Sequence, residues 1–108
     1  MAGFDDREKS FESKWAHDEE LRFRVFARRN KLLGLWAADL MGLGGAQADE
    51  YAKEVISADF QEAGDEDVYR KVKGDFDAKG IDVTEHHLRK RMQDLLEDAH
   101  SQIVLEKK

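Results

Sequence analysis

The sequence predicts an all-α protein, a compact four-helix bundle preceded by a mobile or partly helical N-terminal arm. Its 108 residues include no proline, and residues that favour helices are abundant throughout. Apolar residues recur every three to four positions in four segments, and no segment alternates as a strand does. With 41% hydrophobic and 39% charged residues, each helix carries a narrow apolar stripe. We therefore expect an arm at residues 1–19 and a single-domain bundle at residues 20–108.

The first predicted helix is the longest. It begins either near Phe4 or in the stretch "HDEE", whose carboxylates suit the positive end of a helix dipole, and it continues to Met41. The stretch "MGLGGAQ" then ends it, because glycine readily adopts the conformation of a helix C-terminal turn. Its predicted apolar face consists of Leu21, Val25, Leu32, Trp36 and Leu40, flanked by Phe26, Leu33 and Ala37.

Three shorter helices follow, separated by turns. The second covers "AQADEYAKEVISADFQEA" and ends at Gly64, the third begins at the predicted N-cap Asp65, and the fourth begins at the predicted N-cap Thr84. Their predicted inner residues are Ala52, Val55, Ile56, Phe60 and Ala63; Val68, Val72 and Phe76; and Leu88, Met92, Leu95, Leu96, Ala99 and Ile103. Short connections favour antiparallel packing of neighbouring helices.

Composition excludes several classes of protein. The chain has no cysteine, which removes disulfide and thiolate chemistry and fits a reducing cytoplasm. No apolar run approaches the roughly 20 residues of a membrane span, and the acidic N-terminus does not resemble a signal peptide. A net charge of -6 disfavours general nucleic-acid binding. We expect a soluble cytoplasmic protein that is monomeric when free, inserts into no membrane and binds no nucleic acid.

Motifs for catalysis or metal binding are weak. The string "GLGG" at residues 42–45 follows a predicted helix and lacks the preceding strand of a dinucleotide site and the Lys-Ser/Thr of a P-loop. It is interpreted as a turn. His86 and His87 are adjacent and diverge on a helix, and neither His17 nor His100 has a ligand at metal-site spacing. We therefore expect neither an enzyme nor a metal site.

Two basic clusters have two interpretations. They are Arg22, Arg24, Arg28, Arg29 and Lys31 in the first helix, and Arg89, Lys90 and Arg91 in the last. Such clusters can contact phosphates. The favoured interpretation is that they form ion pairs with acidic helices of the same bundle, each contributing about 0–1 kcal/mol.

The arm carries an aromatic face. Phe4, Phe11 and Trp15 are seven and four residues apart, which places them on one side of a helix. A helix of about 12–15 residues is marginal in water by itself. Two interpretations stay open: the arm becomes helical in the groove of a partner, or it packs on its own bundle.

Long strings of the sequence resemble one family. "FDDREKSFESKWAHDEELRF", "ARRNKLLGLWAADLMGL" and "YAKEVISADFQEAGDEDVYRKV" are similar to the zeta subunit that regulates the F-type ATP synthase of alphaproteobacteria. The resemblance extends over essentially the whole chain. It implies a small four-helix protein that inhibits ATP hydrolysis by the catalytic head, and hence a cytoplasmic location at the periphery of the inner membrane.

The resemblance also implies partners and contact residues. The arm would enter an interface between alpha and beta subunits near the gamma subunit, as a wedge against hydrolytic rotation. Its contact residues would be Phe4, Asp5, Asp6, Arg7, Phe11, Glu12 and Trp15. Weak adenine nucleotide binding is the one cofactor that the family suggests, with candidate contacts at Arg22, Arg28, Arg29 and Arg89. The alternatives are a stand-alone helical adaptor and a nucleotide- or nucleic-acid-binding module.

Overall fold

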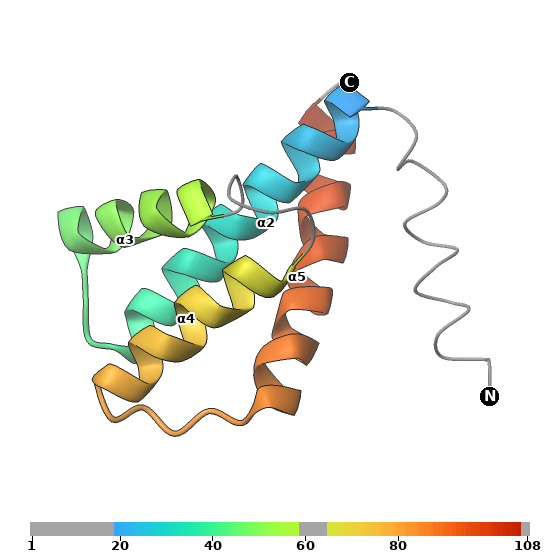
Figure 1. Cartoon of the computed structure of the whole chain (residues 1–108). Helices are drawn as coiled ribbons and strands as arrows, with labels where there is room; N and C mark the ends of the chain where they lie inside the picture. The colour runs from blue at the N-terminus through green and yellow to red at the C-terminus, as the bar shows by residue number, and fades with distance from the viewer. Residues whose placement is uncertain (1–18, 59–64, 107–108) are drawn as a thin grey trace, which may run out of the picture.

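The computed structural model describes residues 19–58 and 65–106, which form four helices and contain no strand (Figure 1). The helices are α2 (Glu19–Leu40), α3 (Gly45–Ala58), α4 (Glu66–Ala78) and α5 (Glu85–Glu106). The predicted all-α, four-helix class is confirmed. Residues 1–18 of the predicted arm lie outside the described residues, as do the last residues predicted for the second helix.

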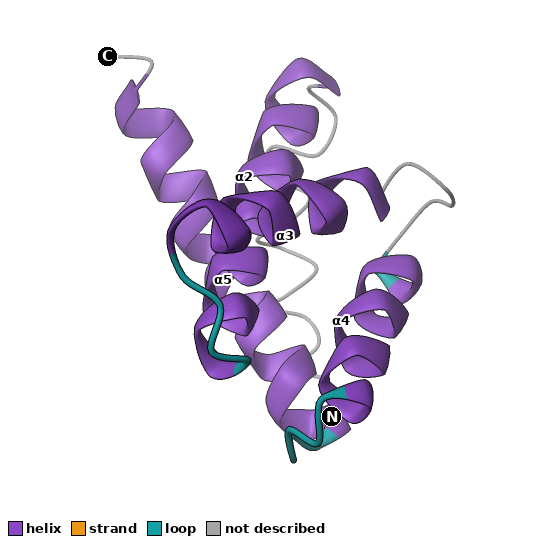
Figure 2. Cartoon of the chain, turned by 90° about the vertical axis from the view of Figure 1, so that its left-hand side faces the viewer, coloured by secondary structure: helices purple, strands orange, loops and turns teal. Residues whose placement is uncertain are grey.

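The central helix is α2, which contacts the other three. It packs most extensively on α3 and α5, and its beginning lies beside the end of α5 (Figure 1). At its other half, the Trp36 ring meets the Phe76 ring of α4 edge-on, with 5.7 Å between their centroids. Short turns link α2 to α3 and α4 to α5 (Figure 2). This arrangement leaves the beginning of α2 and the end of α5 together at one end of the fold.

Glycines end α2 and α4 with the same local geometry. Gly42 has φ 79°, and beyond it the Leu43 N–H donates to the Ala38 carbonyl oxygen over 2.8 Å. This hydrogen bond closes a Schellman turn, for which glycine is suited because it has no Cβ. Gly80, with φ 71°, ends α4 in the same way, and the Ile81 N–H reaches back over 2.8 Å. The interpretation of "GLGG" as a turn is confirmed.

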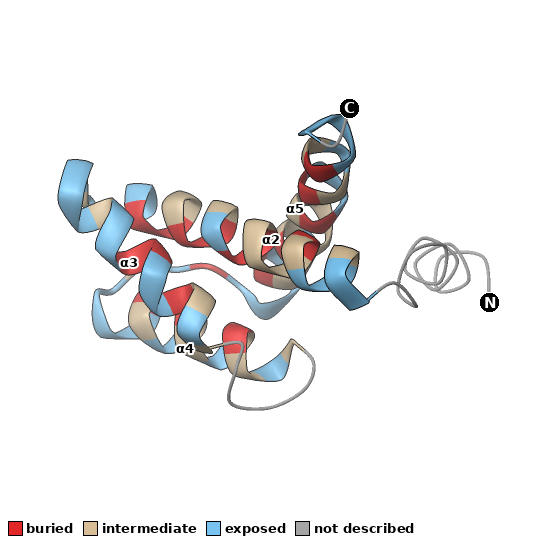
Figure 3. Cartoon of the chain, turned by 90° about the horizontal axis from the view of Figure 1, so that it is seen from above, coloured by how far each residue is buried: buried red, intermediate tan, exposed pale blue. Residues whose placement is uncertain are grey.

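Buried apolar residues of the described chain gather in two clusters, which lie on the inner sides of the helices (Figure 3). The larger involves all four helices, and the smaller joins the beginning of α2 to the end of α5. The predicted core residues that are buried are Ala52, Val55, Val68, Val72, Phe76, Leu88, Met92, Leu96, Ala99 and Ile103. Ile56 and Leu95 are half-buried at the edge, whereas Phe60 and Ala63 lie outside the described residues.

The predicted apolar face of α2 is confirmed at Val25 and at the flanking Leu33 and Ala37, and it is wrong at Leu40. Leu40 is 41% exposed, and Leu32 and Trp36 are half-buried. The buried residues of α2 are Val25, Arg29, Asn30, Leu33, Gly34, Ala37 and Ala38. An apolar pattern counts large hydrophobic side chains alone, but this face buries an arginine, an asparagine and a glycine. Because these three residues are not apolar side chains, the predicted face is turned about the helix axis, away from the observed buried face and toward the large hydrophobic side chains.

The two predicted N-caps behave differently. The Thr84 hydroxyl oxygen accepts a hydrogen bond from the His87 N–H over 3.1 Å, which confirms the cap of α5. Asp65 occupies the N-cap position of α4, but within the described residues its side chain makes no cap hydrogen bond. Its carboxylate instead accepts a hydrogen bond from Arg29 over 2.9 Å. Both partners are charged in the bond to the Arg29 guanidinium, whereas in a cap bond only the carboxylate is, so the Asp65 carboxylate bonds to α2.

Helices α2 and α3 approach closely at Gly34. A Cβ atom at this position would lie 2.6 Å from the Cα of Ala52 and 3.3 Å from a methyl carbon of Val55. Such a distance to a backbone atom is far below van der Waals contact. Where α2 crosses α3, there is therefore room at position 34 only for the hydrogen atom that glycine carries in place of a side chain. This glycine was not singled out from the sequence, because an isolated glycine in a helical segment has no distinctive pattern.

Candidate functional site

The candidate contact residues of the arm lie outside the described residues. They are Phe4, Asp5, Asp6, Arg7, Phe11, Glu12 and Trp15. Their assignment stays a prediction. The other candidates, the four arginines, lie on α2 and α5 and can be placed individually.

Arg28 joins α2 to the end of α5. Its Nη1 donates to Gln102 Oε1 over 2.8 Å and lies 2.7 Å from Glu106 Oε2. The hydrogen bond from Arg28 and the positive charges of Arg28, Arg24 and Lys31 hold the pKa of Glu106 below its ordinary value. The end of α5 is therefore anchored to a basic part of α2.

Arg29 is completely buried beneath the start of α4. Its Nη2 donates to Asp65 over 2.9 Å, and its Nε donates to Asn30 Oδ1 over 2.7 Å. The guanidinium also lies 5.2 Å from the centre of the Phe26 ring, which Arg22 approaches to 5.3 Å. Within the described part of the chain, Arg29 Nη1 and Asn30 Nδ2 are buried with no hydrogen-bond partner. Arg29 is thus a structural group linking α2 to α4, with its charge balanced by Asp65.

Arg89 joins α5 to the start of α4. Its Nη2 donates to Glu66 over 2.8 Å, its Nε donates to Glu85 over 2.9 Å, and its guanidinium stacks 4.0 Å from the Tyr69 ring centre. Hydrogen bonds to these two carboxylates raise the pKa of Arg89. Arg29 and Arg89 therefore meet adjacent carboxylates at the start of α4, whereas Arg28 contacts the end of α5. The ion-pair interpretation is confirmed for these three arginines.

A polar network joins α3 to α4. The Tyr51 hydroxyl donates to Asp75 Oδ2 over 2.7 Å, and Lys71 Nζ bridges Asp75 Oδ2 at 2.9 Å and Glu54 Oε1 at 2.7 Å. Burial by itself lowers the pKa of Lys71, but hydrogen bonds to Glu54 and Asp75 outweigh it and raise the pKa overall. Because α3 contacts α4 much less than it contacts α2, this network is a main link between α3 and α4.

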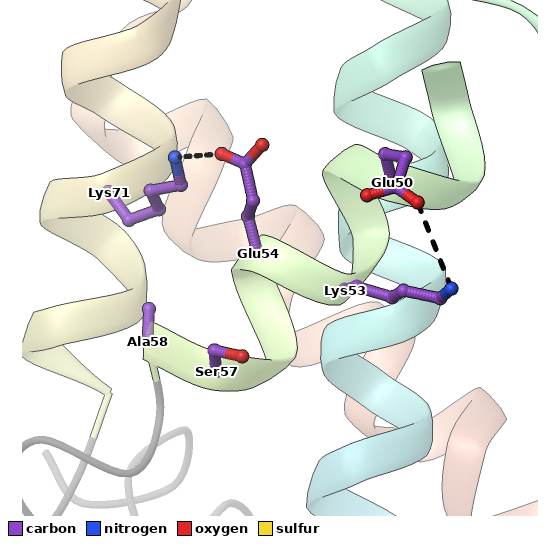
Figure 4. A pocket seen from close by; sticks show the side chains of 6 residues that line it. All are labelled: Glu50, Lys53, Glu54, Ser57, Ala58 and Lys71. Carbon is purple, nitrogen blue, oxygen red and sulfur yellow. Dashed lines mark hydrogen bonds and ion pairs between the residues drawn. The ribbon is translucent and has the colours of Figure 1, made fainter. Parts of the chain in front are cut away.

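A pocket of about 400 Å³ lies beside this network, between α3 and α4 (Figure 4). It is lined by Glu50, Lys53, Glu54, Ser57, Ala58 and Lys71. Both lysines are next to carboxylates, Lys53 at 3.9 Å from Glu50 and Lys71 at 2.7 Å from Glu54. The pocket was not predicted, since its charged residues share no motif. With lysines and glutamates in equal number, it offers no net charge to a ligand.

The network predicts how Tyr51 responds to alkali. Burial, followed by the hydrogen bond to Asp75 and the nearby negative charges, raises the pKa of Tyr51 strongly. The stabilisation linked to the protonated phenol is complete below the unfolded pKa of about 10 and is lost as pH rises toward the folded value. We expect the absorbance difference between wild type and Tyr51→Phe to show no phenolate from Tyr51 until the chain unfolds. Phenolate formation in the folded protein near pH 10 would contradict this.

The described helices show neither a metal site nor a membrane-spanning segment. His86 is exposed, and the His87 ring lies 6.1 Å from the Trp36 ring centre. Residues 19–58 and 65–106 contain no group of three or more His, Asp or Glu side chains placed to hold a metal ion. None of the helices in these ranges combines the length and apolar character that a membrane crossing requires.

Comparison with known proteins identifies relatives of this chain. A search of curated proteins finds no match. A solved structure described as "Solution NMR structure of the protein" is 46% identical, with a TM-score of 0.72 over 80% of this chain and 98% of the other. The family model for ATPase inhibitor subunit zeta matches residues 1–102. The chain therefore belongs to the ATPase inhibitor subunit zeta family, whose role is regulatory and not catalytic.

Proposed function

We propose that this chain inhibits ATP hydrolysis by an F-type ATP synthase by inserting its arm, residues 1–19, into a catalytic interface between alpha and beta subunits. Phe4, Phe11 and Trp15 are the apolar anchors, and the charged residues between them meet the polar rim of the groove. The folded body stays outside, near the gamma subunit, and prevents the arm from passing through. Through this partner the protein acts at the cytoplasmic face of the inner membrane.

One observation carries the proposal: the family match begins at residue 1 and takes in the whole arm. The arm is therefore part of what the inhibitor family shares, in addition to the helical body. Its three aromatic residues share one helical face, which suits a groove on a partner protein. Helix α2 begins at Glu19, so the arm leads directly into the central helix of the body.

The test is ATP hydrolysis by an alphaproteobacterial F-type catalytic head from which its own zeta subunit has been removed. We expect the full chain to inhibit, and the double variant Phe11→Ala/Trp15→Ala to require at least about tenfold higher concentration, because each buried aromatic contributes about 1.5–3 kcal/mol before ordering costs. Thermal unfolding of the variant should match wild type, because on this proposal the two aromatic anchors contact the partner and not the body.

The matched control is Leu40→Ala, which removes an exposed apolar side chain at the opposite end of α2. It should inhibit as wild type does. If the arm variant and the control inhibit equally well, the arm is not the effector and the body must carry the inhibition. Binding of the full chain without any inhibition would mean that this member keeps the partner but does not inhibit it, and failure to bind the head would favour the adaptor alternative.

Weak adenine nucleotide binding stays a prediction. Three of its candidate contacts, Arg28, Arg29 and Arg89, already bond to carboxylates, so a phosphate would have to compete with them. Titration with ATP at low and high salt tests this binding, because phosphate contacts weaken steeply as salt rises.

A further inference from the structure

Helix α2 carries a basic face formed by Arg24, Arg28 and Lys31. These residues follow the spacing i, i+4 and i+7, which places them on one side of the helix. Lys31 is exposed, and Arg24 and Arg28 are half-exposed. Since α2 rises about 1.5 Å per residue, the basic face lies about 7–18 Å beyond Glu19, where the body begins.

A single carboxylate from the end of α5 occupies this basic face. Glu106 lies 2.7 Å from Arg28 Nη1, and the pKa of Glu106 is lowered by the hydrogen bond from Arg28 and by the charges of Arg28, Arg24 and Lys31. Glu20, one turn before Arg24, lies on the same side of α2, so three cations face two carboxylates and leave a local excess of one positive charge. On a chain with net charge -6, this excess marks a surface unlike the rest of the molecule.

Exposed apolar residues accompany the basic face. Among the described residues, four large hydrophobic side chains are exposed, and three of them lie at this end: Phe23 at 58%, Val104 at 37% and Leu105 at 67%. Phe23 precedes Arg24, and Leu105 precedes Glu106, where the beginning of α2 meets the end of α5 (Figure 1). Arginine together with exposed aromatic and aliphatic groups is typical of protein interfaces.

We propose that the basic face is a second docking surface for the ATP synthase head, that it binds a carboxylate-rich protein surface, and that Glu106 occupies the place of a partner carboxylate in the free protein. The proposal rests on the proposed function, because the arm brings the beginning of α2 to the rim of the groove. Complementary charge at such a rim accelerates association, whereas buried aromatic anchors mainly slow dissociation.

The test measures the association rate of full-length variants with the immobilised catalytic head at about 50 and 200 mM salt. We expect Arg24→Gln/Lys31→Gln to associate about threefold to tenfold more slowly at the lower salt, and Glu106→Gln to associate about twofold faster, because charge steers encounter. Both differences should shrink at the higher salt as screening increases. Maximal inhibition at saturating concentration should be unchanged, since the arm is intact.

The control is Lys53→Gln/Lys79→Gln, which makes the same change in net charge on exposed lysines of α3 and of the turn after α4. If it slows association as much as Arg24→Gln/Lys31→Gln does, overall charge explains the rate and the basic face is not a docking surface. If the basic-face variant loses retention on phosphocellulose but associates with the head as wild type does, the face takes a phosphate ligand and the proposal is overturned.

The two proposals fail in different ways. Loss of inhibition in Phe11→Ala/Trp15→Ala, together with wild-type association of the basic-face variant, keeps the arm mechanism and removes the second docking surface. Failure of the wild-type chain to bind the head removes both.

Discussion

Replacing Asp65 with Ala lowers the free energy of unfolding by about 3 kcal/mol, at the lower end of the range for breaking a buried ion pair. The variant leaves the guanidinium of Arg29 fully buried without its carboxylate. The effect stays at the lower end because the Asp65 side chain is 42% exposed, so water can partly replace it. Urea denaturation measures the loss as a lower midpoint with an unchanged slope.

Two further variants identify the cause of this loss. Asp94→Ala removes a carboxylate that lies 2.7 Å from Lys90, but this pair is on the surface, so we expect a cost of about 0–1 kcal/mol. Adding Arg29→Met and Asn30→Leu to Asp65→Ala should recover most of the loss, because apolar side chains of similar size need neither a carboxylate nor the hydrogen bond between Arg29 and Asn30. If the triple variant is as unstable as Asp65→Ala alone, the missing carboxylate is not the cause.

Replacing Gly34 with Ala lowers the free energy of unfolding by about 1–3 kcal/mol, the usual cost of forcing an extra carbon into a packed interior. The new Cβ would lie 2.6 Å from the Cα of Ala52, and backbone cannot move aside as a flexible side chain can. Helices α2 and α3 must therefore separate, which loosens the contact at Val55. Thermal unfolding monitored by circular dichroism measures the shift.

Gly74→Ala is the matched control, since it makes the same substitution inside α4. A Cβ atom at Gly74 would meet nothing within 4 Å. We expect a stabilisation of about 0.4–1 kcal/mol, because alanine restricts the unfolded chain and favours the helix. Opposite signs for the two substitutions would identify the close crossing as the cause. Stabilisation by both would mean that α2 and α3 can separate freely.

Much of the fold could be predicted because α4 and α5 bury simple apolar stripes. In α4, Val68, Val72 and Phe76 recur every four residues and are all fully buried. In α5, the same periodicity together with the Thr84 hydroxyl fixes the helix and its beginning. Such positions depend on local spacing, which the sequence contains directly.

The central helix was harder to predict because its burial depends on residues distant in sequence. Arg29 can be buried since Asp65, on another helix, supplies the opposite charge. Gly34 is buried because Ala52 comes close to it from α3. Neither contact can be recognised from the spacing of apolar residues along α2 itself. The link between Tyr51 and Asp75 was missed for the same reason, since it joins residues 24 positions apart.

The placement of Trp36 gives the protein an internal optical probe. Its indole contacts the Phe76 ring of α4 and lies 5.4 Å below the guanidinium of Arg91 on α5, so its emission depends on how these helices pack. The chain contains one other tryptophan, Trp15, in the arm. Trp15→Phe therefore leaves a fluorophore that follows folding of the body, and Trp36→Phe leaves one that follows capture of the arm. The two events can be timed separately in the unlabelled protein.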